Sequence, residues 1–144
     1  MKMSASDFNG LSAPEKRQII KNRAKQLALD VLDLSKRLPN SPVIRIIRGQ
    51  LLRSATSVAA NYRAACRARS KKEFIAKVGI VIEECDETQF WLELLEEQRN
   101  SDKTKVESLV KETNELVSIF VASRLTAESS LRKPNRPSAI GNRQ

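Results

Sequence analysis

Apolar residues recur at intervals of three and four along most of this chain, which is the period of a helix with one buried face. Short polar breaks divide the pattern into four stripes. Each stripe is typical of a helix that contributes one seam to a shared core. In chain order the stripes are Ile20, Ala24, Leu27, Val31, Leu34 and Leu38; Ile44, Ile47, Leu51, Ala55, Val58 and Tyr62; Phe74, Val78, Val81, Cys85, Leu92 and Leu95; and Val106, Val110, Leu116, Phe120 and Val121.

Helix start and stop signals agree with this division. Ser12–Glu15 and Ser70–Glu73 have the spacing of capping boxes, and Pro14 stands at a permitted early position. Ser41 is a cap followed by Pro42, after a break at Pro39 and Asn40. In the last break, Ser101 or Asp102 is the expected cap. The predicted helices cover about 13–38, 42–67, 71–99 and 102–127.

Short connections between long helices favour antiparallel neighbours. The sequence therefore predicts an all-α fold, an up-and-down antiparallel four-helix bundle over 12–127. Residues 1–11 are expected to be a flexible N-terminus. Residues 128–144 contain two prolines, a glycine, serines and basic residues without periodicity, so we expect a disordered basic tail.

Several apolar residues fall beside the main seams. They either form a second face for subunit contacts or widen one core stripe, and the pattern does not distinguish the two. These residues are Leu32, Leu52, Ile80, Trp91 and Leu94.

The chain has 26 Lys and Arg against 17 Asp and Glu, a net charge of +9. Such a balance favours an anionic partner, such as nucleic acid. The first ten residues lack the apolar run of a signal peptide, and no stretch is long and apolar enough to cross a membrane. The expected location is the cytoplasm, and no membrane partner is expected.

Three segments resemble a known family. They are Gln50–Asn61, Ser70–Phe74 and Glu84–Leu95, with arginine, serine, asparagine and an acidic-threonine block in order. Over about residues 27–125 the chain resembles the four-helix-bundle proteins encoded by intervening sequences in bacterial 23S rRNA genes. The resemblance implies a cyclic homopentamer of bundles. A related protein with a similar fold is the accessory variability protein of diversity-generating retroelements, which implies nucleic acid and a reverse transcriptase or other protein as candidate partners.

The sequence departs from the family pattern after Asn61. Many members continue with an apolar residue, Ala, Glu and Gly, whereas this chain continues with Tyr62, Arg63, Ala64 and Ala65. A positive charge therefore replaces a negative one near the helix end. This places the chain in a more basic subgroup of the family.

The bundle topology brings an excess of basic residues to one end. The start of the first helix, the turn between the second and third helices and the end of the fourth share that end. Arg23 in the first helix and Arg132, Lys133, Arg136 and Arg143 in the tail belong to the same region. We call it the basic end and define it by eight candidate nucleic-acid-binding residues: Lys21, Lys25, Arg63, Arg67, Arg69, Lys71, Lys72 and Lys77.

Lys71 and Lys72 occupy the first turn of a helix, where the helix dipole disfavours cations and free N–H groups favour phosphate. This is an argument for a phosphate-binding role, and a plain solvated surface that binds nothing specific stays an equal alternative. Elsewhere, Arg53, Ser57 and Asn61 share one helical face, and Arg53 is expected near Glu84 and Glu87. These residues form either a polar contact strip or, as the favoured interpretation, a structural network that joins helices or subunits. Arg45 and Arg48 are expected to be neutralised by Glu93, Glu96 and Glu97.

Catalytic function is not expected. The chain has no histidine, the commonest general base and metal ligand. It also lacks the Glu-x-x-His pairs of di-iron bundles and a glycine-rich phosphate loop. Cys66 and Cys85 are expected about 16 Å apart along the axis, too far for a disulfide. No cofactor or metal is expected. Two functions stay open: a nucleic-acid-binding accessory factor, or a self-assembling scaffold or protein adaptor.

Overall fold

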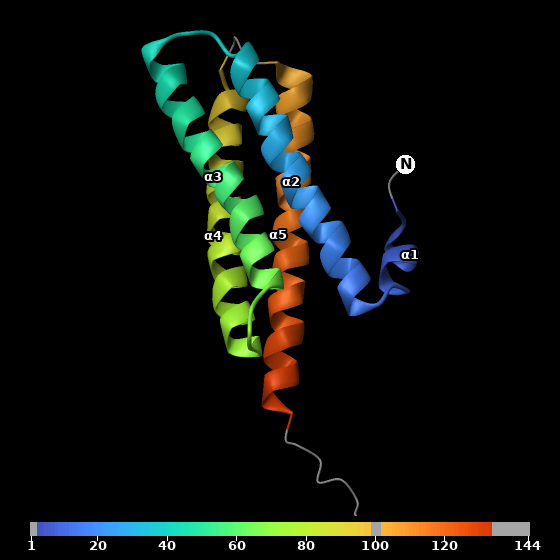
Figure 1. The fold of residues 1–144 in the computed structure, drawn as a ribbon. Helices are drawn as coiled ribbons and strands as arrows, with labels where there is room; N and C mark the ends of the chain where they lie inside the picture. Colours follow the sequence, from blue (N-terminus) through green and yellow to red (C-terminus); the bar gives the residue numbers. More distant parts are fainter. Residues whose placement is uncertain (1–2, 99–101, 134–144) are drawn as a thin grey trace, which may run out of the picture.

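The computed structural model describes residues 3–98 and 102–133, which form five helices and no strand. They are α1 (Ala5–Asn9), α2 (Ala13–Arg37), α3 (Pro42–Cys66), α4 (Lys71–Glu96) and α5 (Lys103–Arg132). The four long helices make an up-and-down bundle with antiparallel neighbours (Figure 1). None of the described helices is long and apolar enough to span a bilayer.

Side-chain caps fix the four long helices at the expected places. Ser12 accepts from Glu15 N–H and Glu15 accepts from Ser12 N–H, a complete capping box. Ser41 and Ser70 each accept from the backbone N–H three residues later. Asp102 does the same for α5, while Ser101 lies outside the described residues.

The core lies between all four long helices and contains most residues of the predicted stripes, while Phe74, Val110 and Val121 are only half-buried. Val31, Leu51, Val81 and Leu116 are fully buried, and the Tyr62 ring packs against Phe120 with centroids 5.3 Å apart. Four buried serine and threonine hydroxyls sit among these apolar residues, and each donates to a carbonyl in the preceding turn of its own helix, which meets its need for a partner. They belong to Ser35, Ser54, Thr88 and Thr113.

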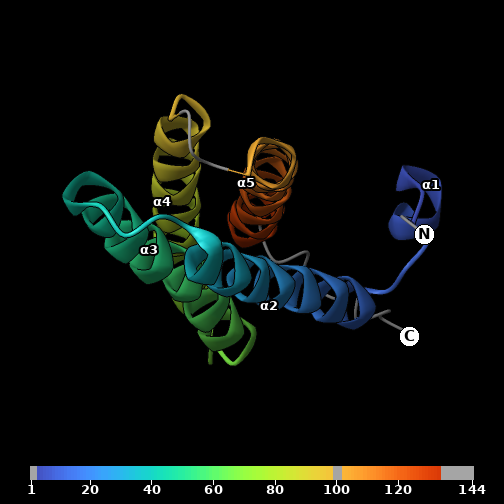
Figure 2. The same ribbon diagram turned by 90° about the horizontal axis from the view of Figure 1, so that it is seen from above.

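The helices do not pack equally. α3 and α4 lie along each other, as do α4 and α5, whereas α2 packs mainly on α3 and only lightly on α5. Seen from above, α2 and α4 lie on opposite sides of the bundle, and the start of α2 points away from it (Figure 2). A groove of about 770 Å³ results between α1, α2 and α5.

The N-terminal segment departs from the expectation of a flexible 1–11. Residues 5–9 form the short helix α1, capped by Ser4, whose hydroxyl accepts from Asp7 N–H at 3.1 Å. Phe8 packs against the edge of the core, and the Lys16 ammonium lies 5.6 Å from the centre of its ring. This apolar anchor accounts for the ordered turn.

The last helix also departs from the expected boundary at 127. α5 continues to Arg132, so residues 128–132 are helical and not part of a disordered tail. Arg124 and Glu128 form an ion pair of 3.8 Å across one turn. Lys133 is extended, as expected for a residue before Pro134. The rest of the predicted tail, 134–144, lies outside the described residues.

Candidate nucleic-acid interface at the basic end

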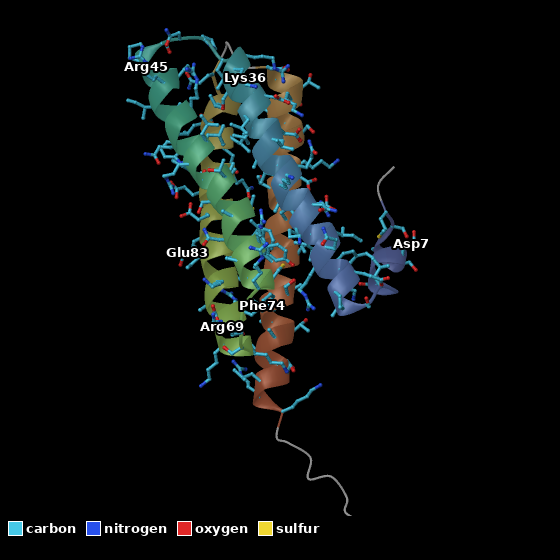
Figure 3. All side chains as sticks on the ribbon, in the orientation of Figure 1. Asp7, Lys36, Arg45, Arg69, Phe74 and Glu83 are labelled. Atoms are coloured by element: carbon cyan, nitrogen blue, oxygen red, sulfur yellow. The ribbon has the colours of Figure 1, made fainter. Side chains whose placement is uncertain are left out.

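The turn between α3 and α4 is built by hydrogen bonds that leave its cations exposed. Ser70 Oγ accepts from Glu73 N–H at 3.1 Å, and Glu73 Oε2 accepts from Arg69 N–H at 3.0 Å. The backbone is thereby fixed by short side chains. The long side chains of Arg67, Arg69 and Lys72 are free to extend into solvent. Figure 3 shows Arg69 at this end and Arg45 at the opposite one.

The extension of α5 adds to this end of the bundle. Lys71 Nζ donates to Ser130 Oγ, so the start of α4 and the last turns of α5 touch. Arg132 and Lys133 lie within three residues of that contact. The expected tail residues Arg136 and Arg143 lie outside the described residues.

The acidic residues near this end are already engaged. Glu73 accepts from the Arg69 N–H, and Glu128 pairs with Arg124. Within 3–98 and 102–133, none of the eight candidate residues forms an ion pair with a carboxylate. Six of the eight are exposed, and Lys21 and Lys77 are half-buried. Lysine and arginine at this end outnumber the nearby carboxylates Glu73 and Glu128, so its field is positive.

The first helix contributes less to the basic end than its sequence suggests. Burial raises the pKa of the Cys66 thiol at the end of α3, and the positive charges of Lys21 and Arg17 on α2 partly counteract this rise. Lys25 lies further along α2 and is exposed. Arg23 was expected at the basic end, but it pairs with Glu112 at 2.7 Å and Glu115 at 3.3 Å on α5.

The candidate network on α3 separates into two parts. Arg53 binds Glu84 at 3.1 Å and also pairs with Glu87, and the Trp91 indole donates to Glu87 at 3.2 Å. The guanidinium of Arg53 holds the pKa of Glu87 below its usual value. Asn61 instead donates to the carbonyl and hydroxyl oxygens of Ser57, both at 2.9 Å within α3. The first part joins α3 to α4, and the second stays local.

Two arginines at the opposite end have other partners than expected. Arg48 donates to the carbonyls of Pro39 at 2.8 Å and Leu38 at 3.3 Å, where α2 ends. Arg45 donates to Asn40 at 3.3 Å. The expected pairing with Glu93, Glu96 and Glu97 was wrong: among the described residues, Arg48 bonds free backbone carbonyls just after α2, and Arg45 bonds the Asn40 side chain.

Two features of the surface were not anticipated from the sequence. The contact between Lys71 and Ser130 depends on the longer α5, for which the absence of Gly and Pro between Ser123 and Lys133 was the available signal. Phe90 is exposed on α4 although its neighbour Trp91 is half-buried. In the part of the chain that the structure describes, no three His, Cys, Asp or Glu side chains are grouped to hold a metal ion.

Comparisons with known proteins place the chain in a family. The family model described as 23S rRNA-intervening sequence protein matches residues 16–122. A crystal structure of a protein with unknown function from the S23 ribosomal protein family, from Bacteroides thetaiotaomicron VPI-5482, is similar at 31% identity and a TM-score of 0.67. The match covers 73% of this chain and 97% of that one. No curated protein matches. The chain belongs to the family of 23S rRNA-intervening sequence proteins.

Proposed function

We propose that this protein is a non-enzymatic, self-assembling accessory factor that binds the phosphate backbone of RNA or DNA through its basic end. One observation carries the proposal. Exposed cations from the turn between α3 and α4 lie beside the end of α5 without carboxylate partners, while the nearby acids are engaged elsewhere. The resemblance adds a pentameric assembly, a relation to the retroelement accessory protein, and a reverse transcriptase or another protein as a further partner.

The chemistry of this end fits backbone contacts better than base reading. Lysine and arginine neutralise phosphates, and this displaces condensed counterions. Base stacking needs exposed aromatic rings, yet the aromatic residues nearest this end, Tyr62 and Phe74, are buried and half-buried. Weak dependence on sequence is therefore expected.

The test is binding of the purified protein to short labelled RNA and DNA across a salt series. The variant R67E/R69E/K72E reverses three exposed cations and leaves Lys71 with its Ser130 contact. A glutamate at position 72 also suits the start of a helix, so folding is preserved. The matched control R45E/K103E/K111E makes the same change in charge at exposed residues away from this end.

We expect the wild type to bind at micromolar concentration or tighter, with affinity falling steeply as salt rises. The basic-end variant should lose at least about tenfold in affinity. The slope of its log affinity against log salt concentration should decrease by the amount expected for the loss of up to about three phosphate contacts. The control should bind within about threefold of the wild type. Equal losses in both variants would show a general charge effect and refute the basic end as the site.

The alternative function is a scaffold or protein adaptor without a nucleic-acid ligand. Exposed apolar residues on the outer sides of α2 and α4 favour it, namely Leu29, Leu32, Ile80 and Phe90. The same salt series decides between the two, since a scaffold of this kind would not bind either nucleic acid above low salt.

A further inference from the structure

Two stripes on the outer surface of the bundle have the same spacing and opposite charge. On α2, Leu29 and Leu32 are 43% and 39% exposed and lie between exposed Lys25 and Lys36. We call these four residues the basic stripe. On α4 and its C-cap, Phe90 is 49% exposed among three exposed acids. We call these four residues the acidic stripe: Asp86, Phe90, Glu93 and the C-cap Glu97.

Both stripes have the heptad spacing that puts residues on one side of a helix. Positions 25, 29, 32 and 36 and positions 86, 90, 93 and 97 are each separated by four, three and four residues. One helix can pack along another through such a seam. Each residue of the basic stripe has a counterpart 61 positions later in the acidic stripe. If the two helices packed with these counterparts level, each lysine would face an acid and Leu29 would face Phe90. Leu32 would face the methylene groups of Glu93.

The two stripes also lie at the same level along the bundle, as their helices' contacts with adjacent residues of α5 show. Arg23 of α2 reaches Glu112, and Cys85 of α4 reaches the carbonyl of Thr113, which is the next residue of α5. Residues 23 and 85 are therefore level to within about one helical turn. Their offset of 62 is close to the offset of 61 that separates the stripes.

Their direction and placement suit a contact between copies. α2 and α4 run the same way along the bundle and lie on its opposite sides (Figures 1 and 2). Two bundles standing side by side with parallel axes would bring α2 of one against α4 of the other. The contact uses two different faces, so repeating it builds a ring when the rotation closes.

We infer that the basic stripe of one copy docks on the acidic stripe of a second copy, in parallel and without a shift along the bundle axis. The inference rests on the self-assembly proposed above and not on nucleic-acid binding. Lys25 then belongs to this contact, and phosphate binding rests on the other seven residues of the basic end. Charge complementarity selects the second copy as occupant. Asp33 is exposed beside the basic stripe. The two lysines and this aspartate together have a net charge of +1, whereas the acidic stripe has three acids and no base.

The acidic stripe is held in place by its own helix. The Phe90 ring meets the Trp91 ring edge to face, with centroids 5.0 Å apart and 66° between the planes. Trp91 is in turn held by its bond to Glu87, which Arg53 of α3 anchors. An aromatic ring fixed in this way offers apolar area at a low cost in conformational entropy. Among the described residues, no hydrogen bond is formed by the side chains of Lys25, Lys36, Asp86 and Glu97. The Glu93 carboxylate accepts one, from the Gln89 side chain.

The test is the mass of the full-length protein in solution, measured by light scattering after size exclusion and without nucleic acid. K25E/K36E makes both faces acidic, and D86K/E97K makes both faces basic. Each should dissociate at least about tenfold more readily than the wild type, because like charges then meet. The variant with all four changes restores opposite charges and should assemble again. Circular dichroism checks folding, and K103E/K111E is the control for charge.

The outcomes separate this inference from the proposed function. A wild-type protein that is monomeric would overturn both the inference and the self-assembly. An oligomer that survives both charge reversals, or that is not restored by the fourfold variant, would overturn the stripe contact and leave the self-assembly standing. Nucleic-acid binding is decided separately by the salt series.

Discussion

Among single residues, Cys85 shows most directly how burial in this bundle changes chemistry. The thiol is fully buried and donates weakly to the Thr113 carbonyl at 3.7 Å. Burial is the main cause that raises its pKa from 9.0 to about 12, with smaller contributions from the negative charges of Asp86 and Glu112. The thiol is therefore a neutral core side chain in the folded protein, and a weak nucleophile.

This pKa predicts a loss of stability in alkaline solution. The unfolded chain ionises the thiol above about pH 9, whereas the folded chain keeps it neutral until about pH 12. The contribution of Cys85 to the free energy of unfolding is thus complete below pH 9 and is lost as the pH rises from 9 toward 12. Urea unfolding from neutral pH to about pH 11 should show this decline.

Cys85→Ala is the matched control for the alkaline decline. It should cost stability at neutral pH through lost packing, but its decline should be smaller than that of the wild type. The gap between the two proteins should therefore narrow as the pH rises. Burial also raises the pKa of Tyr62 and of Cys66, so the variant keeps some decline of its own. Two parallel curves would contradict the assignment to Cys85.

For the helices as elements, the junction of α2 and α3 depends on Arg48. Its guanidinium bonds two carbonyls at the end of α2, including Pro39 O at 2.8 Å. Arg48→Ala should lower the free energy of unfolding by about 1–3 kcal/mol, since charged hydrogen bonds to half-buried carbonyls are lost. The neighbouring exposed Arg45 has a single bond to Asn40. Arg45→Ala should therefore cost less than about 0.5 kcal/mol in the same denaturation experiment. Equal costs would refute this role.

The same junction shows what the sequence could predict about the elements. Serine caps and prolines determine where α2, α3 and α4 begin, and these signals act within one turn, so they are visible in the sequence. The partner of Arg48 depends on the position of the end of α2 relative to α3 in the folded bundle. The pairing of Arg23 with Glu112 likewise depends on the crossing angle between α2 and α5. Apolar periodicity specifies which face is buried but not that angle.

The candidate basic end was predictable to a similar degree. Alternating helix directions bring the turn at Ser70 and the end of α5 to one end of any up-and-down bundle, so the topology is sufficient to gather those cations. The engagement of Glu73 and Glu128 was not predictable in this way, because it depends on the geometry of a helix cap and of one ion pair. The excess of cations over these two acids, which the sequence already shows, distinguishes the basic end from a balanced charged surface.

For the whole molecule, the proposed stripes and the basic end are linked by direction. If α2 of one copy packs in parallel on α4 of the next, every copy points the same way, and all basic ends lie on one rim. A long nucleic acid can then contact several copies at once. The gain is one of effective concentration and requires no new contact.

This arrangement predicts that assembly matters for long ligands and not for short ones. The variant L29S/L32S removes apolar area from the basic stripe and leaves every charge unchanged, so it should dissociate the oligomer without altering any one basic end. Affinity for an RNA long enough to span several copies should fall by about tenfold or more, while affinity for an oligonucleotide that reaches only one copy should stay within about twofold. F90S, on the opposite stripe, should reproduce both results.

Fluorescence anisotropy with the two RNA lengths measures both affinities at one salt concentration. An equal loss for both lengths would mean that Leu29 and Leu32 support the basic end itself, and unchanged affinity for the long RNA in a dissociated variant would show that the basic ends do not act together on one rim.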